Sequence, residues 1–266
     1  MTYCLGILVK EGLVLAADSR TNAGVDYISS YRKLFDFSKP GDRVIVLCTS
    51  GNLSITQAVV HKLAQDIKRG AQGDLSQNRT PSLHSLPTLY DMARYLGEQI
   101  RALQEADRAW LERDRIDFQC SFLLGGQVRG EVPELFLVYS QGNCIQATPE
   151  TPFLQIGETK YGKPILDRTL GFDVPLDAVA KCALLSIDST MRSNLSVGPP
   201  IHMTLYQTNS FEIRHRAQFK AGDPYLIKMR RHWEVALREA ALTMPDIDWH
   251  QDPPLSPLGI ADLGDG

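Results

Sequence analysis

Residues 1–24 read MTYCLGILVKEGLVLAADSRTNAG, and this stretch indicates the type of fold. Two apolar runs, residues 2–9 and 13–17, are separated by Lys10-Glu11-Gly12, a combination typical of a tight turn between antiparallel strands. The first strand is therefore expected to start at residue 2, with no leader ahead of it. Chain termini are usually loose and tolerant of change. A strand that begins so early therefore suggests that the amino terminus itself takes part in the function.

Farther along the chain, strands continue in blocks that are separated by helices. Apolar runs and alternating runs predict strands, and apolar residues at every third or fourth position predict helices. The expected strands are 26–37, 43–49, 118–125, 133–139, 144–148, 201–207 and 211–217, and the expected helices are 52–70, 88–112, 160–170, 175–193 and one from 223 onward. Hairpin-joined strands favour an α+β fold with antiparallel sheets over a doubly wound parallel sheet.

The organisation into domains is expected to be simple. No linker interrupts residues 1–244, which predict one domain with a C-terminal helix. Residues 245–266 are rich in proline, glycine and aspartate and predict an extended tail.

Composition and charge argue against several classes of protein. The chain has 43% hydrophobic and 22% charged residues and a formal net charge of −3, so nothing electrostatic points to nucleic acid or to an anionic membrane. It has no apolar run of the ~18 residues that span a membrane. Its five cysteines are scattered without a C-x-x-C pair, and it has no glycine-rich phosphate loop. We therefore expect a reduced, cytoplasmic protein that uses no metal or organic cofactor.

Residue 2 is threonine, which can combine a nucleophile and a base at a chain terminus. A small second residue permits removal of the initiator methionine, which would make Thr2 the true amino terminus. Its hydroxyl could then attack a carbonyl group while its own α-amine, with a pKa of about 7.7–8.0, takes the proton. Such a site also needs a cation beside the hydroxyl, a carboxylate to hold that cation, and a main-chain N–H for the oxyanion.

Three residues that follow Thr2 in the chain could supply these aids. Asp18 ends the second strand, which the turn brings back beside the first, and Lys33 lies in the candidate strand 26–37. Gly51 lies where a strand turns into a helix, so its N–H could face the site. Each residue alone is more often a turn former, a surface lysine or a turn glycine. Their ordered combination within 51 residues is far more specific.

Four segments of this region also carry a resemblance to a known family. They are TYC at 2–4, GLVLAADSRTNAG at 12–24, Lys33 and Ser50-Gly51. Together they resemble the β-type subunits of the proteasome, which are threonine N-terminal-nucleophile (Ntn) hydrolases, and above all the bacterial branch called Anbu (ancestral β subunit). The resemblance implies a four-layer αββα sandwich of two antiparallel sheets and self-association into a large homo-oligomer. It makes Thr2 the nucleophile, Asp18 and Lys33 its charged support, and the Gly51 N–H the oxyanion donor.

Other positions match the family less evenly. Asn22 and Gly24 fall where the resemblance implies binding of the substrate backbone along a strand edge. The family carries an Asp and a Ser three residues apart after its fourth helix. Here Ser196 can take the role of that serine, but Ser193 stands where the Asp is expected. Glu158 replaces a further family serine.

The leading hypothesis is a threonine hydrolase that cleaves peptide or amide bonds through an acyl-enzyme in a self-assembled oligomer. The two replacements keep a second hypothesis open, a proteolytically silent assembly scaffold of the same fold. A third hypothesis is an Ntn amidase for small molecules or for one kind of bond, such as an isopeptide.

Overall fold

The computed structural model describes residues 2–22, 28–72 and 81–249. The chain divides into two compact units, Met1–Ile227 and Lys228–Gly266. The strands and helices α1 to α4 described below belong to the first unit, and most of helix α5 (Pro224–Leu242) belongs to the second. No helix in the described ranges is both long and apolar enough to cross a membrane.

The amino-terminal hairpin forms the middle of the first sheet, as its sequence predicts. Its strands are β1 (Tyr3–Val9) and β2 (Gly12–Ala17), and both are buried along their whole length. Burial on both faces explains why they consist of continuous apolar runs. The sheet is antiparallel, with the order β10-β1-β2-β11-β12. The three other strands are β10 (Phe153–Gly157), β11 (Ile201–Gln207) and β12 (His215–Phe219).

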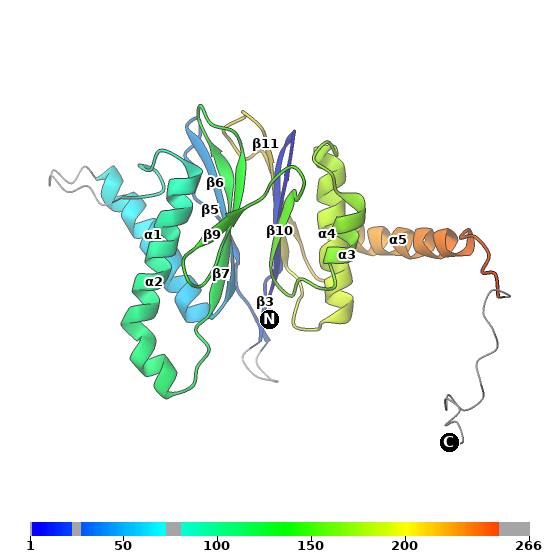
Figure 1. The fold of residues 1–266 in the computed structure, drawn as a ribbon, viewed down its shortest axis with the longest axis horizontal. Coiled ribbons are helices and arrows are strands. Elements are labelled where there is room, and N and C mark those ends of the chain that lie inside the picture. The colour runs from blue at the N-terminus through cyan, green and yellow to red at the C-terminus, as the bar shows by residue number, and fades with distance from the viewer. Residues whose placement is uncertain (1, 23–27, 73–80, 250–266) are drawn as a thin grey trace, which may run out of the picture. The chain divides into compact units, whose positions relative to one another are not determined.

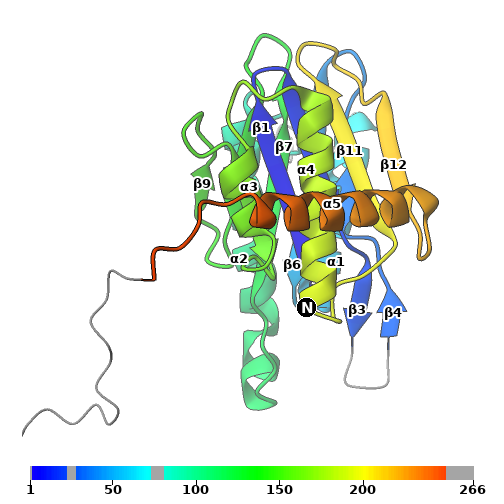
Figure 2. The same ribbon diagram turned by 90° about the vertical axis from the view of Figure 1, so that its right-hand side faces the viewer.

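The second sheet is also antiparallel and has the order β5-β6-β7-β8-β9. Its strands are β5 (Leu34–Asp36), β6 (Arg43–Gly51), β7 (Cys120–Val128), β8 (Glu134–Val138) and β9 (Cys144–Gln146). Two short strands, β3 (Arg20–Asn22) and β4 (Ile28–Ser30), form a separate ribbon. In Figure 2 this ribbon extends from the end of the first sheet at which β1 begins.

Helices cover the outer side of each sheet (Figure 1). Helices α1 (Leu53–Ala71) and α2 (Leu89–Arg113) pack against the second sheet. Helix α4 (Leu176–Ser193) packs against β1, β2 and β11 of the first sheet, and α3 (Lys163–Thr169) packs against α4. The start of α1 is held by Asn52, because its side-chain oxygen accepts hydrogen bonds from two main-chain N–H groups of the first turn.

Strand β6 illustrates how the two hydrophobic cores are divided. Val44, Val46 and Cys48 belong to a cluster that they share with apolar residues of β1 and β2. Ile45 and Leu47 belong to the other cluster, together with apolar residues of α1 and α2. Successive side chains of a strand point to opposite faces, so β6 contributes to the core between the sheets and to the core under the helices.

Two expectations about single strands were wrong, and one further strand was not expected. The strand expected at 26–37 is split, because β4 pairs with β3 in the ribbon whereas β5 pairs with β6 in the second sheet. The strand expected at 211–217 lies later, at β12. Strand β10 was not expected, and it forms the edge of the first sheet beside β1.

Candidate active site

Thr2 lies directly before β1 and is only 8% exposed. The main-chain N–H of Glu158, directly after β10, donates a hydrogen bond of 2.7 Å to the Thr2 carbonyl oxygen. A β-carbon on Gly157 would lie 1.9 Å from the same oxygen, so only glycine permits this close approach. The unexpected strand β10 therefore fixes the main chain of the predicted nucleophile.

Asp18 follows the end of β2 and is completely buried. Its Oδ1 atom accepts hydrogen bonds from the main-chain N–H of Tyr3 at 3.0 Å and from Lys33 Nζ at 2.7 Å. Its Oδ2 atom accepts from the N–H groups of Arg20 at 3.2 Å and Gly198 at 3.1 Å. One carboxylate thus joins the residue after Thr2, the expected lysine and two further segments of the chain.

Lys33 lies between β4 and β5, where the chain passes from the ribbon to the second sheet, and not within a strand as predicted. Its residue is only 5% exposed, and its Nζ also donates to the carbonyl oxygen of Arg20 at 2.6 Å. The passage of the chain from the ribbon to the second sheet places Lys33 in the interior, beside Asp18, as its position in the sequence had suggested.

The Asp18–Lys33 pair brings opposite charges together in a place that excludes water. Burial raises the pKa of the Asp18 carboxyl above its usual value, and the Lys33 ammonium and the main-chain N–H groups oppose that rise. An ammonium group held in low-dielectric surroundings interacts strongly with any negative charge that develops nearby. The arrangement can therefore stabilise an alkoxide or an oxyanion next to Tyr3, on the side of the chain where Thr2 lies.

Gly51 ends β6 with φ of +104°, a conformation that favours glycine. A β-carbon at this position would lie 2.3 Å from the carbonyl oxygen of Gln119, so the glycine also permits close packing of the main chain. The neighbouring Ser50 Oγ lies 3.2 Å from the place where a Gly157 β-carbon would stand. The end of β6 therefore lies beside the junction at which β10 meets Thr2.

Ser196 lies half-buried in the loop that follows α4. Two hydrogen bonds bring this loop to the site. The Arg20 guanidinium donates to the carbonyl oxygen of Leu195 at 2.7 Å, and the Gly198 N–H donates to Asp18. The loop is thus tied to the segment that carries Asp18, although about 180 residues separate the two in the sequence.

The two predicted substrate-binding residues lie in or near the ribbon. The main chain of Asn22 belongs to β3 and pairs with Ile28 of β4. Gly24 lies outside the described residues. The ribbon continues directly from Asp18, and Lys33 Nζ is bonded to the β3 main chain at Arg20, so β3 begins at the candidate site.

Several residues of the site were missed by reasoning from the sequence. Gly157, Gly198 and the main chain of Glu158 contact Thr2 or Asp18, and these contacts were not predicted, although the family pattern pointed to both segments. The signals for Gly157 were its place before Glu158, where the family has a serine after a glycine, and its place at the end of the short apolar run FLQIG, which forms β10. The signal for Gly198 was its place at the end of the segment RSNLSVG, residues 192–198, which matches the family's Ser followed by Gly.

The Tyr3 hydroxyl supports β1 from the side of α4. It lies 2.6 Å from Ser186 Oγ and accepts a hydrogen bond from Gln155 Nε2 at 2.5 Å. A β-carbon on Gly162 would lie 2.4 Å from this hydroxyl, so the group is tightly enclosed. Burial raises the pKa of Tyr3 to about 12.

This shifted pKa predicts a loss of stability at alkaline pH. Between about pH 10 and pH 12 the unfolded chain releases the Tyr3 proton while the folded protein keeps it, so the free energy of unfolding falls by about 2–3 kcal/mol. In urea titrations across this range, the unfolding free energy of wild type should fall more steeply than that of Tyr3→Phe. Parallel declines would contradict the assignment.

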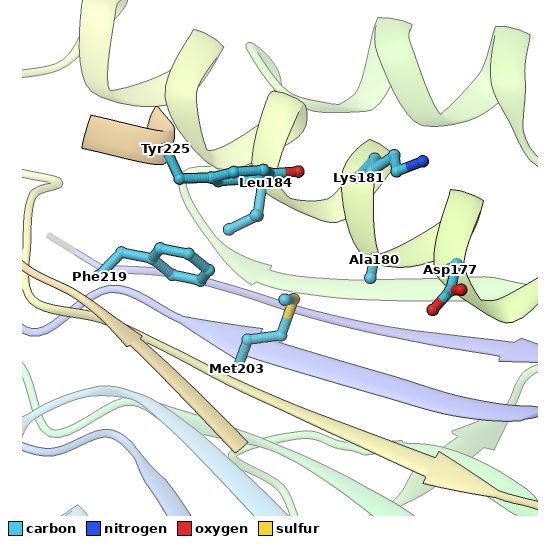
Figure 3. A pocket seen from close by; sticks show the side chains of 7 residues that line it. All are labelled: Asp177, Ala180, Lys181, Leu184, Met203, Phe219 and Tyr225. Atoms are coloured by element: carbon cyan, nitrogen blue, oxygen red, sulfur yellow. The ribbon is translucent and has the colours of Figure 1, made fainter. Parts of the chain in front are cut away.

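A separate pocket of about 310 Å³ lies between α4 and the strands β11 and β12 (Figure 3). It is lined by Asp177, Ala180, Lys181, Leu184, Met203, Phe219 and Tyr225. None of the predicted site residues lines it. Within the ranges that the structure describes, no three His, Cys, Asp or Glu side chains gather so that they could hold a metal ion.

Comparison with known proteins gave matches among solved structures. A scan against protein-family models found no match, and neither did a search of the curated proteins. The Anbu complex from Pseudomonas aeruginosa, solved as a helical assembly, is 42% identical with a TM-score of 0.85, and the match covers 94% of this chain and 100% of that chain.

Two further solved structures are similar. Anbu (ancestral β-subunit) from Yersinia bercovieri is 41% identical with a TM-score of 0.83, over 92% of this chain and 98% of that one. The Anbu (Gly-1) mutant from Hyphomicrobium sp. strain MC1 is 41% identical with a TM-score of 0.83, over 93% and 100%. These likenesses extend over nearly the whole chain, and the resemblance noted in its first 52 residues is confirmed. The chain belongs to the Anbu family of proteasome-like ancestral β subunits.

Proposed function

We propose that this protein is a threonine Ntn hydrolase that cleaves peptide or amide bonds. The observation that carries the proposal is the buried Asp18 carboxylate, which binds Lys33 at 2.7 Å and the main chain next to Thr2 at 3.0 Å. A buried cation held beside a threonine at the chain terminus is what activation of its hydroxyl requires.

In the proposed mechanism the α-amine of Thr2, freed by removal of Met1, takes the proton of the hydroxyl as Oγ1 attacks the substrate carbonyl carbon. The Lys33 ammonium stabilises the developing negative charge, and the Gly51 N–H donates to the oxyanion. The C–N bond then breaks, and the leaving amine departs with the proton. Water hydrolyses the resulting ester on Thr2, with the same α-amine as base. Ser196 adds a hydroxyl to the polar support of the site.

We further propose that the substrate is an extended chain that pairs with β3. Its main chain would run along the segment that contains Asn22 and Gly24, in the manner of an added strand. Main-chain pairing tolerates many side chains, so it would supply affinity, whereas side-chain pockets would supply specificity.

Self-assembly is part of the proposal. The similar protein from Pseudomonas aeruginosa was solved as a helical assembly, which supports association of this chain with copies of itself. The packing of α1 and α2 on one sheet and of α4 on the other supports the four-layer αββα arrangement. The second half of α2 is mostly exposed and offers surface for contacts between subunits.

The proposal is tested by the intact mass of the purified protein before and after treatment with a peptide epoxyketone. This reagent closes a ring on the hydroxyl and the free amine of a terminal threonine. We expect a chain that is lighter by one methionine and that gains a single adduct. Thr2→Ala should still lose its methionine, because alanine is also small, but it should gain no adduct.

The matched control is Thr151→Ala, which removes a hydroxyl from an exposed threonine and should label like wild type. An adduct that persists in Thr2→Ala would contradict the role of Thr2. Retained Met1 without any adduct would favour the silent scaffold. The structural observation on the side of the scaffold is Glu158, which stands where the family has a serine and whose main-chain N–H donates to the Thr2 carbonyl oxygen.

A further inference from the structure

Glu158 contacts two separate parts of the site at once. Its main-chain N–H donates to the Thr2 carbonyl oxygen at 2.7 Å. Its carboxylate oxygen Oε2 accepts a hydrogen bond of 3.0 Å from Asn194 Nδ2, at the end of α4. The side chain is 12% exposed, so most of the carboxylate is out of contact with bulk water. Glu158 is therefore bonded both to the predicted nucleophile and to the loop after α4.

Asn194 passes this connection on to Ser196. Its Oδ1 atom accepts a hydrogen bond of 2.9 Å from the Ser196 N–H, an arrangement by which asparagine shapes a turn. The amide thus donates at one end to Glu158 and accepts at the other end from the loop. Gly198, at the far end of the same loop, is bonded to Asp18. The loop that carries Ser196 is held at both ends by residues that also hold the main chain at Thr2.

The charge of Glu158 makes its contact with Asn194 a strong one. A hydrogen bond to an ionised carboxylate is roughly twice as strong as one between neutral groups. Lys160 Nζ lies 3.9 Å from the other carboxylate oxygen, but this lysine side chain is 70% exposed. So exposed a partner contributes little. The Asn194 amide is therefore the contact through which the carboxylate acts on the site.

We propose that Glu158 is a positioning residue for the threonine nucleophile, and this inference rests on the proposed function. Its main chain fixes the carbonyl group of Thr2, while its carboxylate fixes Asn194 and, through it, the loop of Ser196. The strand β10 and the end of α4 are thereby coupled across Thr2. Loss of the carboxylate shifts the loop and the nucleophile relative to each other, which slows reaction without removing a reacting group.

The test measures the rate of labelling by a peptide epoxyketone, together with the free energy of unfolding in urea, for the full chain. Glu158→Ala is expected to slow labelling by about 10- to 100-fold, which corresponds to loss of a hydrogen bond to a charged group. Glu158→Gln keeps an acceptor oxygen for Asn194 and should slow it by less than about tenfold. Glu150→Ala removes a carboxylate from an exposed turn and should label like wild type.

A swapped pair keeps the test decisive if Glu158→Ala folds poorly. Asn194→Asp alone places two carboxylates against each other and should slow labelling. Adding Glu158→Gln restores the hydrogen bond with donor and acceptor exchanged, and it should recover most of the rate. A double variant no faster than Asn194→Asp would overturn the inference, because coupled residues must deviate from additivity.

The outcomes separate this inference from the proposed function. If wild type gains no adduct at Thr2, the proposed function fails and the inference falls with it. If wild type labels and Glu158→Ala labels at the same rate, the inference is wrong and the proposed function stands. Slower labelling with unchanged unfolding free energy supports positioning, since a merely structural role would lower both.

Discussion

Lys33→Met is expected to destabilise the protein by about 3–5 kcal/mol, because it leaves a buried carboxylate without its cation. Asp18 is completely buried, and Lys33 is its ion-pair partner at 2.7 Å. The methionine side chain preserves most of the volume of lysine, so the effect measures the charge. Urea unfolding monitored by circular dichroism gives the free energy, and epoxyketone labelling of Thr2 should be lost in the same variant.

Lys163→Met is the matched control. Lys163 pairs with Asp167 at 2.6 Å, a similar distance, but both side chains are about half exposed. Such a surface pair contributes only about 0–1 kcal/mol. The double variant Asp18→Asn with Lys33→Met should lose less stability than the two single variants lose in sum. The reason is that the double variant leaves no buried charge without a partner. Equal losses in Lys33→Met and Lys163→Met would refute this account of the pair.

Gly157→Ala is expected to displace Thr2 and to destabilise the protein by about 2–5 kcal/mol, the sum of backbone strain and overpacking. Its φ is +85°, and an added β-carbon would lie 1.9 Å from the Thr2 oxygen and 2.7 Å from its carbonyl carbon. Both atoms belong to the main chain and cannot rotate away. A displacement of about 1 Å can cost about 100-fold in rate, so labelling of Thr2 should fall by at least that factor.

Gly130→Ala is the control that distinguishes the effect of backbone strain from the effect of a steric clash. Gly130 has a similar φ of +93°, but a β-carbon there would meet nothing within 4 Å. The unfolding free energy of Gly130→Ala should fall by only about 1 kcal/mol, the cost of placing alanine in this backbone conformation. Its Thr2 should label like that of wild type. If both glycine variants lost the same stability and labelling, the close approach of β10 to Thr2 would not matter.

Reasoning from the sequence succeeded where the deciding contacts are local. The turn at Lys10-Glu11-Gly12 joins adjacent strands, so the antiparallel register that sets Asp18 beside Tyr3 follows from the hairpin itself. Asn52 caps the helix that it immediately precedes. The residues that make these contacts lie close together in the sequence, so the hydrophobic periodicity and the turn-forming and cap-forming residues are enough to predict them.

Reasoning from the sequence failed where a strand is defined by its pairing with a segment far away in the chain. Strand β10 is five residues long and pairs with β1, about 150 positions away. So short an apolar run is also compatible with a loop or a helix end. The split of the expected strand 26–37 has the same cause, since β4 and β5 belong to different sheets.

The sequence by itself determined the residue types of the candidate site, the hairpin that begins it, and the family to which the chain belongs. The tertiary structure alone decided which groups meet. It brought Lys33 to Asp18 through the change of sheet, Gly157 to Thr2 through β10, and Asn194 to Glu158 through the end of α4. The physical reason is that local patterns record which face of an element is buried, whereas hydrogen bonds between distant segments depend on how the sheets and helices pack.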